Sequence, residues 1–367
     1  MITRQQFLRT SAVLAAAPFA GCTDANLPDS YEAAVNNIWR PTAGRPTGQL
    51  ALRRELVRFA TLAPSGHNTQ CWKYNLAASD NAITILPDFT RRTPVVDPDD
   101  HHLFVSLGCA LENMAQASLA FGLKSQARFD PATQALRVAL EPTQALTSTL
   151  YQAITTRQCT RGPYDGNQVS APELKLLENA GTGNGVRVML FTAKLDVEKI
   201  LELVLQGNST QLSDAAFVKE LKQWLRFSAS QAVITGDGLY SITSGNPSVP
   251  RWVGSPMFDM MVSAKSENDK YAEQTRSSAG IAVFMSGVDN KTHWIEAGRC
   301  YERFALQATA LGIRNAMLNQ AVEVPAMRQQ LATFLGIKVG RPDLVVRFGR
   351  GPVMPQSLRR VVASVLV

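Results

Sequence analysis

Two stretches of sequence, far apart along the chain, decide the fold. "GCALENMAQASLAFGL" spans residues 108–123 and "GRCYERFALQATALGI" spans residues 298–313. Five residues of the first stretch recur in the second, each 190 positions later and without a gap: Gly108, Glu112, Ala115, Ala120 and Gly122. Both stretches predict helices that end at a glycine and carry enough small residues to approach another helix closely. Chance similarity between alanine-rich helices is the alternative, but five ungapped matches favour an internal duplication.

A second, weaker pair of matching segments locates an insertion. "ELVRFATLA" at residues 55–63 resembles "ELKLLENA" at residues 173–180, and this pair is 72 residues closer together than the first pair. The second half therefore carries additional chain, between about Leu195 and Ser278. It includes "SGNPSVPRWVGSPMFDMM" at residues 244–261, which is broken by proline and glycine yet rich in large apolar side chains. A long irregular apolar segment of this kind predicts a lid.

Strand patterns alternate with helical patterns in both halves. The strand patterns are "ITIL", "LRVAL", "VRVMLF", "GIAVFMSG" and "DLVVRFG". They predict an α/β or α+β protein made of two similar halves with a sheet in each. We place the first half at residues 49–150 and the second at residues 151–367, with the lid at about residues 195–278.

The first 22 residues, "MITRQQFLRTSAVLAAAPFAGC", have the order of an export signal. Arg4 and Arg9 precede a short apolar run, and small residues precede Cys22. "TRQQFLR" resembles a twin-arginine motif and "FAGC" resembles a lipoprotein box, in which Cys22 would carry lipid. An N-terminal amphipathic helix is the alternative. We expect residues 23–48 to be a tether, and the protein to be exported to the periplasm or cell envelope, with the membrane reached only through Cys22.

Composition excludes several classes of partner. The chain has 367 residues, a net charge of +7 and a pI of about 9.3, yet its Lys and Arg residues are scattered. This pattern favours local anion sites over a nucleic-acid-binding arm. No apolar stretch approaches the roughly 20 residues of a membrane-spanning helix.

A loop in the first half is unusually rich in hydrogen-bonding groups. "APSGHNTQCW" at residues 63–72 offers Ser65, Gly66, His67, Asn68 and Gln70, with little bulk. Its counterpart in the second half, "GTGNGVRV" from Gly181, has lost the proline, the glutamine and the tryptophan. The asymmetry predicts one functional site in a molecule with two halves. Caps of a simple turn are the alternative role for Ser65 and Asn68.

The anion-binding candidates lie mostly in the second half. "TTRQCTRGPYDG" at residues 155–166 places Arg157 and Arg161 four residues apart, where both guanidinium groups could reach one phosphate. The C-terminal "RFGRGPVMPQSLRR" adds Arg350, Arg359 and Arg360. Solvated surface charges are the alternative for any one of these arginines.

These motifs, in this order, resemble the nitroreductase superfamily, and more closely its fused, Acg-type FMN-binding branch. The resemblance covers roughly residues 50–365. It implies an α+β three-layer sandwich in which a dimer has become one polypeptide, acting as a monomer. It also implies FMN as the cofactor, with the loop residues Ser65, Gly66, His67, Asn68 and Gln70 near the flavin ring. The implied phosphate ligands are Arg157, Thr160, Arg161, Arg350, Arg359 and Arg360. Cys71 departs from the family's proline. Cys159 departs from its phosphate-binding serine, for which Thr160 would substitute.

The resemblance implies two-electron flavin chemistry on a small nitro or quinone acceptor, with a small-molecule donor and no catalytic side chain. The alternative is a flavin-binding or flavin-sequestering protein with little turnover, because an exported protein lacks the cytoplasmic nicotinamide pool. A structural lipoprotein with degenerate sites is a more remote alternative. "DPDDHHLF" at residues 97–104 could suggest a metal site, but acidic residues before a helix predict capping, and we expect no metal.

Overall fold

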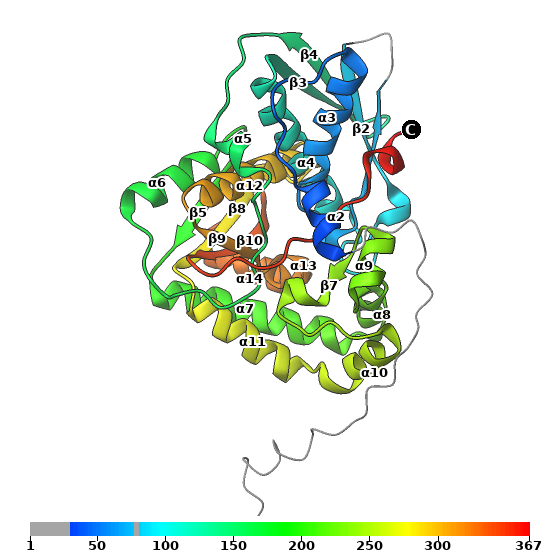
Figure 1. Cartoon of the computed structure of the whole chain (residues 1–367). Coiled ribbons are helices and arrows are strands. Elements are labelled where there is room, and N and C mark those ends of the chain that lie inside the picture. The colour runs from blue at the N-terminus through cyan, green and yellow to red at the C-terminus, as the bar shows by residue number, and fades with distance from the viewer. Residues whose placement is uncertain (1–29, 77–80) are drawn as a thin grey trace, which may run out of the picture.

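The computed structural model describes residues 30–76 and 81–367 (Figure 1). The expected export signal lies outside the described residues. The first half builds a sheet with strand order β1-β2-β4-β3, and the second builds a sheet with order β5-β8-β10-β9. The strands of the first sheet are β1 (Trp72–Asn75), β2 (Ala82–Pro87), β3 (Leu123–Asp130) and β4 (Ala135–Pro142). Those of the second are β5 (Val186–Phe191), β8 (Gly280–Ser286), β9 (Arg314–Met317) and β10 (Arg341–Gly349). Every neighbouring pair in both sheets is antiparallel, which makes the fold α+β.

The two halves use their elements in the same order. In the first half, α3 (Gln49–Thr61) precedes β1, and α4 (His101–Ala120) runs between β2 and β3. In the second half, α6 (Ala171–Ala180) precedes β5, and α12 (Lys291–Ala310) runs between β8 and β9. Replacing β1, β2, β4 and β3 by β5, β8, β10 and β9 converts one sheet order into the other. The shared topology agrees with the repeat in the sequence.

The helices that carry the repeat cross each other through their first matched glycines. A Cβ atom added to Gly108 would overlap the carbonyl oxygen of Ile295, and one added to Gly298 would overlap that of Val105. Val105 and Ile295 are themselves 190 positions apart, so each contact is the counterpart of the other. Reciprocal contacts of this kind are the property of a two-fold interface. The crossing of α4 and α12 therefore marks a pseudo-two-fold axis.

The additional chain of the second half lies between β5 and β8. It forms α7 (Lys194–Ser213), α8 (Ala215–Trp224), β6 (Leu225–Arg226), α9 (Ala229–Thr235), β7 (Leu239–Tyr240), α10 (Arg251–Met261) and α11 (Ala264–Arg276). A shorter addition between β9 and β10 forms α13 (Gln320–Glu323) and α14 (Pro325–Phe334). Apolar residues of α7 and α14 pack on Ile281, Val283 and Val345, while Ala282, Phe284 and Val346 belong to the main core with α12. The second sheet is thus covered by helices on both faces.

Residues 30–48 are not a free tether, contrary to our expectation. They include α2 (Tyr31–Ile38), which packs on α9, and the rings of Tyr31 and Tyr240 lie 4.8 Å apart. Trp39 is buried and its Nε1 donates to the carbonyl of Ser357 at 2.9 Å. The short helix α5 (Thr149–Ala153) joins the halves. Within the described ranges, no helix combines the length and apolarity needed to cross a membrane.

Candidate functional site

A cavity of about 610 Å³ opens where the two halves and the insertion meet. The loop from Pro64 to His67 forms one wall, and Cys159 and Arg161 of the second half approach from another side. Helices α7, α8, α10 and α11 of the insertion cover it, and Arg347 of β10 completes the lining. This volume falls within the roughly 300–1,000 Å³ of small-molecule and cofactor sites.

The loop of residues 64–70 holds a strained backbone. His67, Asn68 and Gln70 all adopt left-handed conformations, with φ of 48°, 53° and 53°. Such conformations cost about 1–3 kcal/mol each for residues other than glycine, and they persist only where surrounding contacts impose them. Ser65 Oγ accepts the N–H of Gln70 at 2.9 Å, which closes the loop on itself. The result presents Ser65, Gly66 and His67 to the cavity.

Asn68 and Gln70 turn away from the large cavity, and their amides bind the insertion. Asn68 Nδ2 donates to the carbonyl of Gly238 at 2.9 Å, and Gln70 Nε2 donates to that of Gly236 at 2.8 Å. Gln70 is fully buried, and its Oε1 accepts the N–H of Arg360 at 2.8 Å. The two amide side chains of this loop therefore hold backbone segments of the insertion and of the C-terminal region in place.

An ion-pair cluster lies at the same junction, and no pattern in the sequence predicted it. Asp237 of the insertion pairs with Arg226 at 2.6 Å and also with Arg91 of the first half. Arg91 Nε donates to the carbonyl of Thr69 at 2.5 Å. Because Arg91 and Asp237 come from distant parts of the chain, only the folded structure brings them together.

Arg161 is the charged group best placed to bind something in the cavity. Among the described residues it has no side-chain hydrogen bond or ion pair, although its backbone is held firmly. Gln274 Nε2 donates to the carbonyl of Arg161 at 2.7 Å, and Arg347 donates to the carbonyls of Thr160 and Gly162 at 3.1 and 2.8 Å. The charge of Arg161 also acts on the nearby His67. Burial first, and then Arg161 and His102, lower the pKa of His67 to about 4, so its ring is neutral at pH 7.

A second, smaller cavity of about 50 Å³ lies on the other side of Ser65 and Cys159. Arg157, Arg161 and Arg359 all line it, together with Asn68. Its volume would admit about three water molecules. Burial and the charge of Arg157 lower the pKa of Arg359 to about 9, which shows that the positive charges here repel one another. Three arginines around so small a space have the chemistry that could hold a compact anion.

Arg157 also has a structural role that its spacing from Arg161 did not reveal. It is buried, lies 3.1 Å from Glu302, and donates to the carbonyl of Leu62 at 2.7 Å. Burial raises the pKa of Glu302 to about 7 despite the opposing charge of Arg157. This arginine therefore supports the core as well as lining the smaller cavity.

The backbone around Cys159 explains the position of Thr160. Cys159 forms a parallel bridge with Asn315, so the segment is extended here. Arg157, Gln158, Cys159 and Arg161 line the smaller cavity, while Thr160 is fully buried and lines neither cavity. Thr160 is therefore not placed to replace the missing serine hydroxyl.

Two of the C-terminal arginines lie away from both cavities. Arg350 pairs with Glu173 at 2.6 Å. Arg360 donates to the carbonyls of Gln70 and Trp72 at 2.5 and 3.2 Å. Of Arg350, Arg359 and Arg360, Arg359 alone lines a cavity, and it also donates to the carbonyls of Leu62 and Ala63.

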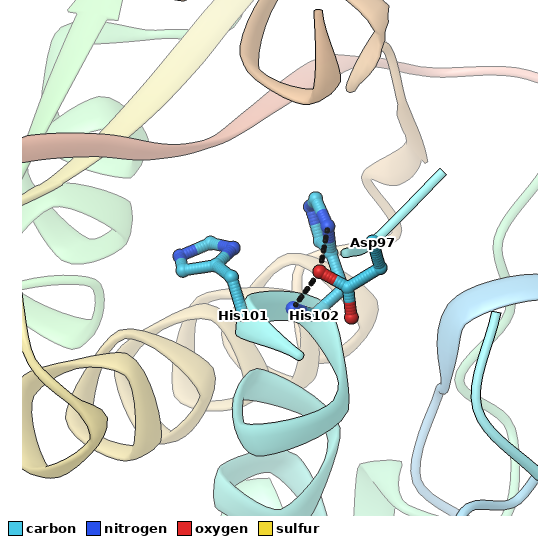
Figure 2. A group of neighbouring side chains, drawn as sticks. All are labelled: Asp97, His101 and His102. Atoms are coloured by element: carbon cyan, nitrogen blue, oxygen red, sulfur yellow. Dashed lines mark hydrogen bonds and ion pairs between the residues drawn. The ribbon is translucent and has the colours of Figure 1, made fainter. Parts of the chain in front are cut away.

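Asp97 caps α4 as the sequence predicted, since its oxygens accept the N–H groups of His102 and Leu103, both at 3.0 Å. Asp97, His101 and His102 come together at the start of the helix, with possible ligating atoms within 4.8 Å of one another (Figure 2). His101 Nε2 is already bonded to Asp343 at 2.9 Å. Asp97 and His102 line the large cavity, which the sequence did not lead us to expect.

The insertion contributes apolar side chains to the cavity. Met257, Phe258 and Met261 of α10 line it, and Gly254 lets the helix pack on Phe227. The same helix is only partly covered, since Trp252, Met260 and Met261 are 79%, 85% and 65% exposed.

Comparisons with known proteins agree with this arrangement. Two Mycobacterium tuberculosis proteins, Rv3131 and Acg, are named provisionally as NAD(P)H nitroreductases, and each is 23% identical to this chain. The Rv3131 match covers 85% of this chain and 90% of the relative, and the Acg match covers 85% and 94%. No protein-family model matches the sequence. A Bacteroides fragilis nitroreductase with bound FMN is 14% identical to this chain, with a TM-score of 0.37, and the match covers 58% of this chain and 96% of that protein.

The chain is therefore similar, along most of its length, to the Acg-type proteins that are named as NAD(P)H nitroreductases.

Proposed function

We propose that this chain is an FMN-dependent oxidoreductase of the nitroreductase type, acting on a small nitro compound or quinone. One observation carries the proposal. A cavity large enough for a cofactor adjoins a small pocket of three arginines, and Ser65, Cys159 and Arg161 border both. A large space joined to a compact anion site matches a ligand with a bulky ring system and a phosphate.

The residues present fit such a cofactor. The side chain of Arg161 has no partner among the described residues, and Arg359 Nε is buried without a hydrogen-bond acceptor in that part of the chain. Arg157 Nε lies 3.1 Å from Glu302, so Arg157 would add mainly its charge. These donors would hold the phosphate. Gly66 has open space around the position of a Cβ atom, so a flat ring can approach its backbone closely.

The flavin would supply the two-electron chemistry, while the protein binds it and controls access to it. Ser65, Gly66 and His67 would border the ring, and the neutral state of His67 avoids placing a second positive charge beside Arg161. Helix α10 would exclude water and bulky substrates from the cavity. The donor would be a nicotinamide nucleotide, as the names of the relatives suggest.

We further propose that one site functions in a duplicated chain. The arginine pocket and the loop of residues 64–67 meet once, at the cavity described above. This arrangement supports a monomer that acts as a pseudo-dimer with one flavin. Export, and a lipid anchor at Cys22, remain proposals that rest on the sequence of residues 1–22.

The decisive experiment purifies the protein, releases the flavin by heat and measures the flavin-to-protein ratio, and then adds NADPH without oxygen. A ratio near one, with bleaching of the flavin absorbance, is expected. A colourless protein that does not bind added FMN would refute the proposal. Retained flavin that NADPH does not reduce would favour the second candidate, a flavin-binding protein with little turnover, which the cover provided by the insertion also supports.

A further inference from the structure

The large cavity contains an aspartate–histidine pair that flavin binding does not require. Asp97 and His102 both line it. The two capping bonds at 3.0 Å fix the carboxylate of Asp97, and one of its oxygens lies 3.6 Å from His102 Nδ1 (Figure 2). A fixed carboxylate beside one ring nitrogen orients the imidazole and stabilises its protonated form.

The other ring nitrogen lies beside an amide whose orientation is determined. Asn319 Oδ1 accepts the N–H of Val345 at 3.1 Å, so Asn319 Nδ2 is the atom that lies 3.3 Å from His102 Nε2. An amide donor suits the neutral ring, in which Nε2 accepts. The protonated ring carries a hydrogen on Nε2, and no described residue offers it an acceptor at hydrogen-bond distance. A molecule in the cavity can supply that acceptor.

The charges around His102 keep it available as an acid near neutral pH. Burial lowers its pKa, but the hydrogen bond and charge of Asp97, with the charge of Glu323, more than offset this, and the pKa lies above its ordinary value. Arg341 opposes the shift, and His101 contacts the ring edge-on at 4.8 Å.

We propose that His102 is the catalytic acid that protonates an oxygen atom of the electron acceptor during its reduction in this cavity. The proposal rests on the flavin function proposed above. With a quinone as acceptor, a bound reduced flavin would supply the two electrons and the proton of the first O–H bond. The Nε2–H bond of His102 breaks as the second O–H bond forms, the hydroquinone leaves, and His102 regains a proton from solvent. Asp97 is a positioning residue for this step.

The test separates electron transfer from proton transfer. Flavin in the purified protein is reduced with one equivalent of dithionite and mixed rapidly with benzoquinone or with ferricyanide, which takes electrons without protons. We expect His102→Gln to slow oxidation by benzoquinone about 10²-fold and to leave oxidation by ferricyanide unchanged. In the unaltered protein the benzoquinone rate should fall as pH rises through the pKa of His102, and the variant should lose this dependence. His293→Gln, on α12, is the matched control and should change neither rate.

A second measurement does not depend on turnover. The chain has four histidines, so NMR titration can follow each ring, and the His102 signal is the one absent from His102→Gln. We expect its pKa to lie above 6.5 and to fall in Asp97→Asn. Equal slowing with both acceptors, no slowing with either, or a His102 pKa below 6.5 would overturn the proposal while leaving the flavin function standing. A protein that binds no flavin would overturn both.

Discussion

Replacing Gly108 by alanine tests the pseudo-two-fold crossing of α4 and α12 directly. The new Cβ would overlap the carbonyl oxygen of Ile295 and lie 2.8 Å from its carbonyl carbon, where ordinary contacts begin at 3.4 Å. Both obstructing atoms belong to backbone, so no side chain can rotate away. The two helices must move apart, and they make the most extensive helix–helix contact in the described structure.

The magnitude follows from two opposing effects. Overpacking of a tight core costs typically 1–3 kcal/mol, and a backbone obstruction belongs at the upper end of that range. Alanine in a helix interior returns about 1 kcal/mol relative to glycine. We therefore expect Gly108→Ala to lower the free energy of unfolding by about 2 kcal/mol. Gly298→Ala should do the same, because its Cβ would meet Val105 in the same geometry.

The double variant carries the stronger prediction. One separation of the helices relieves both overlaps, so the combined loss should fall short of the sum by about 0.5 kcal/mol or more. Urea unfolding followed by circular dichroism measures all three variants. Gly66→Ala, where a Cβ meets no atom within 4 Å, serves as the control and should stay within about 0.5 kcal/mol of the parent. Strict additivity, or a single variant as stable as the parent, would refute the shared crossing.

Three further predictions concern the cavities. Arg161→Ala should weaken FMN binding about ten-fold or more and leave riboflavin binding unchanged, as measured by isothermal titration; equal effects on both flavins would refute a phosphate role for Arg161. Arg157→Ala should instead lower the free energy of unfolding, measured in urea, by about 3 kcal/mol, because Glu302 would be left buried without its partner. Because the pKa of His67 is lowered in the folded protein, the unfolded chain takes up a proton on this ring first as pH falls. The free energy of unfolding should therefore decline from about pH 6.5 to pH 4 by up to about 3 kcal/mol. His67→Asn, whose side chain tolerates the left-handed backbone, should lose this part of the decline in unfolding experiments. Replacing residues 247–262 by a Gly/Ser linker of equal length should increase quenching of flavin fluorescence by iodide, and unchanged quenching would leave α10 without a covering role.

The two matching helices and the fold class could be predicted from the sequence because each helix and each strand depends on a pattern that is local in the chain. The helices at residues 108–123 and 298–313 matched without gaps, and five strands were readable from their apolar runs. Strands β3 and β9 were missed. β3 is mostly exposed and β9 has only four residues, so neither shows a long apolar run.

The partners of the polar loop could not be predicted, because they depend on the path of the insertion. Asn68 and Gln70 are amides with several possible hydrogen bonds, and the sequence alone does not distinguish a ligand from a backbone carbonyl. Their partners, Gly236 and Gly238, lie more than 160 positions away. The same limit concealed His102, since its role becomes visible only once α4, α13 and β10 surround one cavity.

The arginines show how burial changes the meaning of a motif. Arg157 and Arg161 are chemically equivalent in the sequence, and both line the smaller cavity. Arg157 lies beside the fully buried Glu302. Because an unpaired buried carboxylate would be costly, the main role of Arg157 is to pair with Glu302. Arg161 lies at the cavity wall, and its side chain has no such partner among the described residues. A mutation that removes either charge therefore tests a different property: the stability of the core at Arg157, and the binding of an anion at Arg161.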